Sequence, residues 1–159
     1  MLESLSRVII HAPHIPLLRH LALHCQTSAM THALAFEQSL ETVASYCEDP
    51  VPLVYAQIFE RYPEMEALFI LDTDHGARGH MLNEALSCAQ DLLGPDTFAT
   101  SFISAERQNH EGYAISDDIF EAFYTTMHSV FRDLSNGEWT PAMDAAWQAV
   151  FEKVAVARL

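Results

Sequence analysis

The stretch Asn109-His110-Glu111-Gly112-Tyr113-Ala114-Ile115 lies between two passages of helical pattern and combines a histidine with a glycine. Residues 97–109 before it are only weakly periodic and suggest a short helix or helical turns that lead into His110. After it, apolar residues recur at helical spacing. Glycine and polar residues between periodic segments commonly mark a turn, so we interpret this stretch as a loop-like passage between helices. The segments on either side therefore decide the fold class.

The segment that follows this loop has a strong helical pattern. Ser116 is a good N-cap, and Asp117 and Asp118 place negative charge in the first turn, where the helix dipole is positive. The apolar residues of one wide face are Ile119, Phe120, Phe123, Tyr124, Met127, Val130, Phe131 and Leu134. Asn136-Gly137 ends this helix, and Thr140-Pro141 supplies the N-cap and first residue of a last helix. That last helix is marked by Met143, Ala146, Trp147, Val150, Phe151 and Val154.

Four further helical segments precede the loop. The first runs from Leu34 to about Tyr46, and the second follows the prolines of Pro50-Val51-Pro52. Pro63 opens a short third helix, and the fourth runs from near Ala77 to the break at Gly94-Pro95-Asp96. Their apolar faces carry, in order, Phe36, Leu40, Val43, Ala44 and Cys47; Leu53, Tyr55, Ile58, Phe59 and Tyr62; Met65, Ala67, Leu68 and Phe69; and Met81, Leu82, Ala85, Cys88, Ala89 and Leu92. No segment shows sustained strand alternation, so we predict an all-α fold.

The N-terminal part of the chain has a different character. Pro13 and Pro16 interrupt its apolar runs, and we predict an irregular arm over residues 1–32 and one compact domain over residues 33–159. Alternatively, Met30 is the natural start, because a well-formed helical pattern follows it directly.

Composition excludes several classes of function. The formal net charge is −14, with eight Lys and Arg residues, and no basic cluster is present to neutralise the phosphates of nucleic acid or an anionic membrane. Cys25, Cys47 and Cys88 are too widely spaced for a short thiolate metal motif and are typical of free thiols in a reducing compartment. No apolar run approaches the roughly 20 residues of a membrane helix. We therefore expect a cytoplasmic protein.

A helical chain of this size is compatible with a four-helix bundle, a helical adaptor or a globin, and the order of its landmarks distinguishes them. Tyr55 precedes the peptide Tyr62-Pro63-Glu64-Met65-Glu66-Ala67-Leu68-Phe69, and His110 follows about forty residues after Phe69. Trp139-Thr140-Pro141 and Ala146-Trp147 then begin the last helix. Over about residues 34–156, this series resembles the bacterial single-domain haemoglobins and the globin domain of flavohaemoglobins.

The resemblance implies a globin fold, a three-on-three helical sandwich around a pocket for haem b. His110 matches the histidine that ligates the iron in that family, and a neutral imidazole whose other nitrogen is hydrogen-bonded is the usual donor. Gly112 is expected to relax the backbone at the turn, Ile115 and Phe120 to pack on the haem, and Phe69 to stack against the porphyrin from the opposite loop. No catalytic residue is assigned.

On the opposite, distal side of the haem, Tyr55 matches the family's tyrosine, whose hydroxyl can donate to a bound diatomic ligand. If the helix is oriented so that Met81 and Leu82 point into the pocket, Ala77 lies at the usual distal position, and Arg78 or His80 lies near the haem propionates. His80 as the distal residue would put Glu84 one turn later facing the haem, and a lone carboxylate there is costly to bury. His75 and Arg78 are further candidates for the distal position.

The function that the resemblance implies is reversible binding of oxygen, carbon monoxide and nitric oxide, for oxygen transport or storage or for oxidation of nitric oxide with a separate reductase as electron donor. Phe151 stands where flavohaemoglobins carry a tyrosine, and the matching glutamate of the last helix is missing, which argues against a peroxidase-like site. The alternative function is that of a haem-free, globin-like sensor or interaction module that binds a protein partner.

Overall fold

The computed structural model describes residues 16–158, which form helices and connecting turns without any strand. The elements are α1 (Pro16–Tyr46), α2 (Val51–Arg61), the 3-10 helix η1 (Pro63–Phe69), α3 (Gly76–Leu93), α4 (Ala99–Glu111), α5 (Asp117–Leu134) and α6 (Pro141–Val156). The all-α prediction is therefore confirmed. None of the helices in this part of the chain combines the length and apolar character needed to cross a bilayer.

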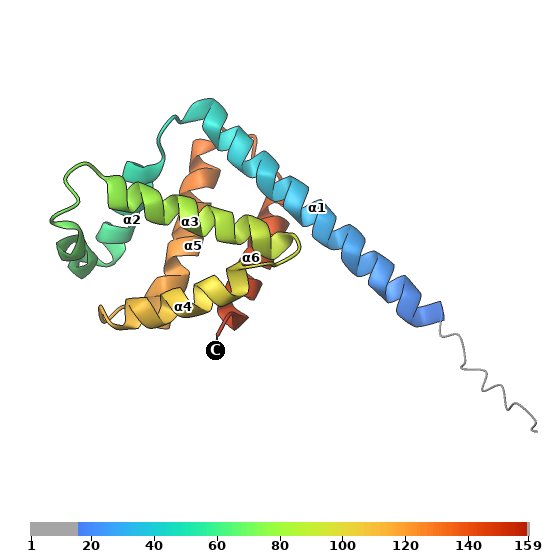
Figure 1. Cartoon of the computed structure of the whole chain (residues 1–159). Helices are drawn as coiled ribbons and strands as arrows, with labels where there is room; N and C mark the ends of the chain where they lie inside the picture. Colours follow the sequence, from blue (N-terminus) through green and yellow to red (C-terminus); the bar gives the residue numbers. More distant parts are fainter. Residues whose placement is uncertain (1–15, 159) are drawn as a thin grey trace, which may run out of the picture.

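The helices pack in two layers (Figure 1). Helix α3 contacts α1 and α4 within one layer, and α5 contacts α2 and α6 within the other. The layers meet most extensively where α1 lies against α6, and α3 also contacts both α2 and α6. Helices α3 and α4 of one layer thus face α2 and α5 of the other.

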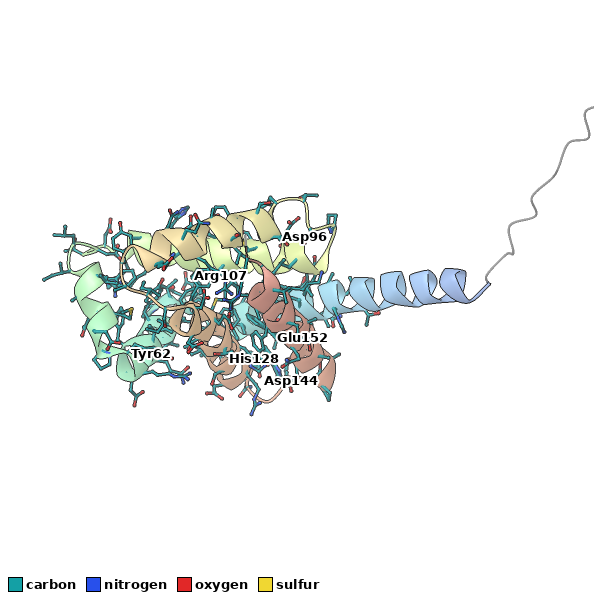
Figure 2. The ribbon with its side chains drawn as sticks, turned by 90° about the horizontal axis from the view of Figure 1, so that it is seen from below. Tyr62, Asp96, Arg107, His128, Asp144 and Glu152 are labelled. Atoms are coloured by element: carbon teal, nitrogen blue, oxygen red, sulfur yellow. The ribbon has the colours of Figure 1, made fainter. Side chains whose placement is uncertain are left out.

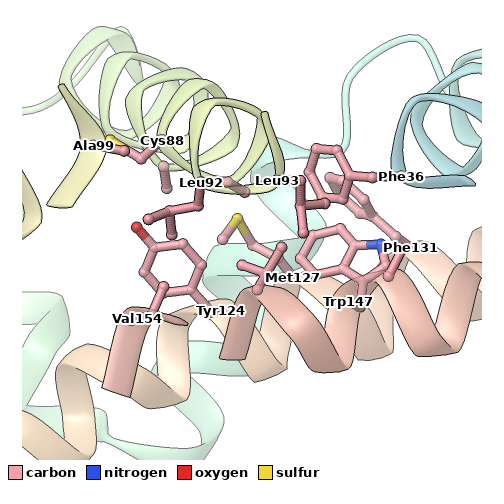
Figure 3. Close-up of a cluster of buried hydrophobic side chains, with 14 of the residues drawn as sticks. Phe36, Cys88, Leu92, Leu93, Ala99, Tyr124, Met127, Phe131, Trp147 and Val154 are labelled. Carbon is pink, nitrogen blue, oxygen red and sulfur yellow. The ribbon is translucent and has the colours of Figure 1, made fainter. Parts of the chain in front are cut away.

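A buried aromatic cluster holds the two layers together (Figure 3). Trp147 of α6 is fully buried, and its ring lies 5.0 Å from that of Phe36 on α1 and 5.8 Å from that of Phe131 on α5. Its indole Nε1 donates to the hydroxyl of Ser39, 3.0 Å away, which is also fully buried. A buried indole N–H needs such a partner, so this contact fixes α6 against α1.

The two N-cap residues predicted from the sequence, Ser116 and Thr140, are confirmed. The Ser116 side chain accepts a hydrogen bond from the amide of Ile119, and the Thr140 side chain accepts one from the amide of Met143. These bonds satisfy amides that lack a partner at a helix start. They fix where α5 and α6 begin.

Two sequence-based predictions of local structure were wrong. Helix α1 begins at Pro16, so residues 16–32 are helical and not irregular, because a proline is well accommodated at a helix start. Residues 1–15 lie outside the described part of the chain, and the domain boundary at residue 33 stays a prediction. Figure 1 shows the N-terminal half of α1 extending past the other helices.

The second correction concerns the loop around His110. Helix α4 continues through Glu111, so His110 lies in its last turn and the loop begins at Gly112. Gly112 has an ordinary helical φ of −60°, and the residue with a positive φ is Ala114, at 62°. Ala114, rather than the glycine, therefore adopts the left-handed conformation of this turn.

Candidate functional site

A cavity of about 220 Å³ lies between α2, η1, α3, α4 and α5, and its wall is predominantly apolar. Of the residues predicted from the sequence, seven line it: Tyr55, Phe69, His80, Met81, His110, Ile115 and Phe120. The apolar wall is completed by residues such as Ile58, Met65, Ile103 and Phe123. A mostly apolar cavity with a few polar groups is the usual form of a cofactor site.

His110 reaches this cavity from the last turn of α4. Its Nδ1 lies 2.7 Å from the backbone oxygen of Glu106, one turn earlier in the same helix. A carbonyl oxygen can only accept, so in the neutral ring Nδ1 carries the proton and Nε2 keeps its lone pair. The imidazole is therefore held in the tautomer that ligates a metal through Nε2.

Tyr55 contributes a buried hydroxyl to the cavity. The residue is 2% exposed, and its hydroxyl oxygen has no hydrogen-bond partner among the described residues. Burial raises the pKa of Tyr55, so the phenol stays protonated and keeps its donor hydrogen. An unpaired buried hydroxyl is unfavourable, and a small ligand in the cavity would supply the missing acceptor.

Aromatic contacts fix the position of that hydroxyl. The Tyr55 ring packs edge-on against Phe69 of η1 at 5.3 Å and lies 5.6 Å from the ring of Phe123 on α5. Phe120 lies edge-on to His110, with 5.2 Å between the ring centroids. Tyr55 and His110 are thus each held by aromatic side chains of the same cavity wall.

The expected orientation of α3 needs correction. His80, Met81, Glu84, Ala85 and Cys88 line the cavity, whereas Ala77, Arg78 and His75 are not part of its wall. Met81 lies in the cavity wall as expected, whereas Leu82 and Ala77 do not line it; the roles of these residues toward a haem stay predictions. Glu84 keeps partial exposure to solvent, so its presence there avoids the cost of full burial that argued against His80 as a distal residue.

Asp72 explains where Ala77 and Arg78 lie. Its carboxylate accepts from the Ala77 amide at 2.8 Å and from Arg78 Nε at 2.8 Å. The hydrogen bond from Arg78 lowers the pKa of Asp72 and keeps it ionised. The first turn of α3 is therefore tied to the preceding loop, although Arg78 still stands 5.9 Å from the ring of Phe69.

Three charged residues in or near the cavity wall, Glu84, Glu106 and Arg107, were not assigned to the site from the sequence. Glu84 was considered but placed away from the cavity, and Glu106 was not considered although it also lines the wall. Arg107 is buried, and its guanidinium lies 4.8 Å from the ring of Phe120. The position of Arg107 on the same helix face as Ile103 could have indicated from the sequence that this arginine is buried. Phe151 packs against His128 and Trp147 and is not part of the cavity wall.

The cavity fits a haem by its donor set. It offers the His110 imidazole, whose Nε2 keeps a lone pair in the neutral ring, the buried Tyr55 hydroxyl without a hydrogen-bond partner among the described residues, and an apolar wall. The residues that would hold the group are His110 at the iron and Phe69, Met81, Ile115 and Phe120 at the porphyrin.

Comparison with known proteins agrees with this reading. The model of the globin family matches residues 53–157, which is more than half of the chain. No curated protein and no solved structure matched. The expected globin fold is therefore confirmed, while the bacterial haemoglobin or flavohaemoglobin subgroup stays a prediction. The chain belongs to the globin family, whose general function is reversible binding of gases at a haem.

Proposed function

We propose that the chain binds haem b in the cavity beside Tyr55 and His110, with His110 Nε2 as the protein ligand of the iron. The observation that carries this proposal is the hydrogen bond from His110 Nδ1 to the Glu106 carbonyl, which in the neutral ring leaves the lone pair on Nε2 of a histidine that lines the cavity. The bound group supplies an iron centre with one open position for a diatomic molecule. The side chains of the cavity wall would bind and orient this group.

The ligands of this site are oxygen, carbon monoxide and nitric oxide. The Tyr55 hydroxyl is a neutral donor in a place of low polarity, where a hydrogen bond is stronger than in water. A diatomic ligand that would become partly negative on binding, such as oxygen, would gain most from this donor. We infer that Tyr55 favours oxygen over carbon monoxide.

Oxidation of nitric oxide is a further activity of the same site. One oxygen molecule, one nitric oxide molecule and one electron give one nitrate ion, so continued turnover takes an electron from a separate reductase. The net charge of −14 favours a reductase with a basic docking face. Measured nitrate formation with and without a reducing system checks this activity.

The absorption spectrum tests the proposal. The purified chain, expressed with ample haem, is expected to show a Soret band that shifts when carbon monoxide is added to the reduced protein. A chain that is folded, as judged by helical circular dichroism, but colourless under these conditions contradicts the proposal. That result would favour the alternative of a haem-free interaction module.

A further inference from the structure

The buried side chain of Arg107 lies on α4, three residues before His110. Only 7% of the side chain is exposed, and Figure 2 labels it in the interior beside α5 and α6. A cation in such a place is unfavourable unless it is paired and hydrogen-bonded. Its partners therefore show what the residue holds together.

These partners come from two other helices. Nη1 lies 2.6 Å from an Asp117 carboxylate oxygen, and Nη2 lies 2.9 Å from Glu121 and 2.7 Å from the backbone oxygen of Val154. Asp117 and Glu121 belong to the first turns of α5, and Val154 lies in the last turn of α6. Arg107 thus joins α4 to α5 and to the carboxyl end of α6, where a cation is favoured.

Arg158 completes the cluster from the exposed side. It pairs with both Asp117 and Glu121, and its side chain is 52% exposed. The cluster therefore contains two cations and two carboxylates. The hydrogen bond from Arg107 lowers the pKa of Asp117, so this carboxylate stays charged. Loss of either arginine changes the charge of the cluster by the same amount.

The two arginines differ in their contact with Phe120. The Arg107 guanidinium carbon lies 4.8 Å from the Phe120 ring centroid, within the range of a cation–π contact. Phe120 in turn lies edge-on to the imidazole of His110, at 5.2 Å and 82°. The hydrogen bond of His110 to Glu106 fixes one ring atom, and Phe120 limits rotation of the ring about that bond.

We propose that Arg107 is a positioning residue for His110: by joining α4 to α5 and α6 and by packing on Phe120, it sets the orientation of the imidazole in the cavity. This inference rests on the proposed role of His110 as iron ligand. The residues that orient a ligating histidine commonly affect metal affinity by roughly 10–100-fold. Arg107 acts through Phe120 and does not itself touch the ligand site.

The test compares Arg107→Gln, Arg107→Lys and Arg158→Gln in the haem-loaded full chain. The iron–histidine stretching band of the reduced protein, recorded by resonance Raman spectroscopy, reports how the imidazole is held. Both Arg107 variants are expected to shift or broaden this band and to speed haem loss roughly tenfold. Lysine keeps the charge but lacks the flat fork that pairs with several acceptors and stacks on a ring. Arg158→Gln removes the same charge and is expected to keep the wild-type band.

Two results would overturn the inference. A wild-type band in Arg107→Lys would show that charge alone suffices, and an equal shift in Arg158→Gln would show that the cluster acts through its electric field. Phe120→Leu removes the aromatic ring between Arg107 and His110 and leaves the ion pairs in place. It is expected to shift the band as well, and adding Arg107→Lys to it should change the band little further.

A haem-independent readout separates this inference from the proposed function. If the wild-type chain takes up no haem, the proposed function fails, and the nuclear magnetic resonance shifts of the His110 imidazole are then compared in the haem-free full chain. Arg107→Lys should move these shifts, and Arg158→Gln should not. Unchanged His110 shifts in Arg107→Lys would contradict the positioning role on their own.

Discussion

Tyr55 and His110 show how single residues gain a chemical role from their partners. The His110 tautomer follows from one backbone carbonyl, and the availability of the Tyr55 hydroxyl follows from the lack of a partner among the described residues. Both side chains line one cavity, so the functional claim depends on them more than on any other pair.

Replacing Tyr55 with phenylalanine removes the proposed donor while keeping the ring. We expect oxygen to dissociate on the order of tenfold faster, since one net hydrogen bond contributes about 1 kcal/mol and more when the acceptor carries charge. Stopped-flow displacement of oxygen by carbon monoxide measures this rate. Tyr46→Phe is the matched control, because the Tyr46 hydroxyl donates to Glu138 away from the cavity. An unchanged rate in Tyr55→Phe would remove the distal hydrogen bond from the account.

The orientation of α3 predicts that Met81, but not Ala77, affects the rate of carbon monoxide binding. Met81 lines the cavity, and Met81→Ala should enlarge it and raise the rate of carbon monoxide binding several-fold. Ala77 is exposed, and Ala77→Leu should leave that rate unchanged. Flash photolysis of the carbon monoxide complex measures both. A strong effect of Ala77→Leu would instead favour the orientation expected from the sequence, in which Ala77 and Met81 both face the pocket.

At the scale of elements, a side chain of α3 sets the start of α4. The Asp91 carboxylate accepts hydrogen bonds from the amides of Phe98 and Ala99, each at 2.9 Å, and from the hydroxyl of Thr97. These are donors that a helix start leaves unpaired. Helix α4, which carries His110, is therefore anchored to α3, which carries the opposite wall of the cavity.

Asp91 also makes the stability of the fold depend on pH. Desolvation raises the pKa of Asp91, but the amide and hydroxyl hydrogen bonds outweigh it and lower the pKa to about 2, from an ordinary 3.8. A lowered pKa stabilises the fold above about pH 4, and this contribution disappears as the pH falls toward 2. Asp91→Asn should therefore lower the urea midpoint at pH 7 and approach the wild type near pH 2. Asp133→Asn, at an exposed position of α5, is the control. A urea midpoint of Asp91→Asn that stays below that of the wild type at pH 2 would contradict this explanation.

Across the whole molecule, the contact between Trp147 and Ser39 joins α6 to α1 through the centre of the core. Ser39→Ala leaves a buried indole N–H without its partner, and we expect a loss of about 1–3 kcal/mol in the free energy of unfolding. Urea denaturation followed by circular dichroism measures it. Ser45→Ala is the matched control, since Ser45 lies on the exposed face of the same helix. Equal losses in the two variants would show that helix propensity, and not this contact, is responsible.

The parts of the fold that sequence predicted were those set by local pattern. The apolar stripe of α5 and the caps at Ser116 and Thr140 depend on residues within a turn or two of one another. Arg107 was missed because its partner Val154 lies far along the chain, so the pairing exists only in the folded protein. The sequence could not show that Ala77 and Arg78 lie outside the cavity wall, because both donate hydrogen bonds to Asp72 in the folded loop before α3.

The most direct measurement of the central claim is the spectrum of His110→Gly after reconstitution with haem. This variant removes the proposed ligand and leaves space for free imidazole. We predict a Soret band unlike that of the wild type, which returns to the wild-type position when imidazole is added, while His80→Gly keeps the wild-type band throughout. A wild-type spectrum from His110→Gly without added imidazole would contradict the assignment of His110 as the iron ligand.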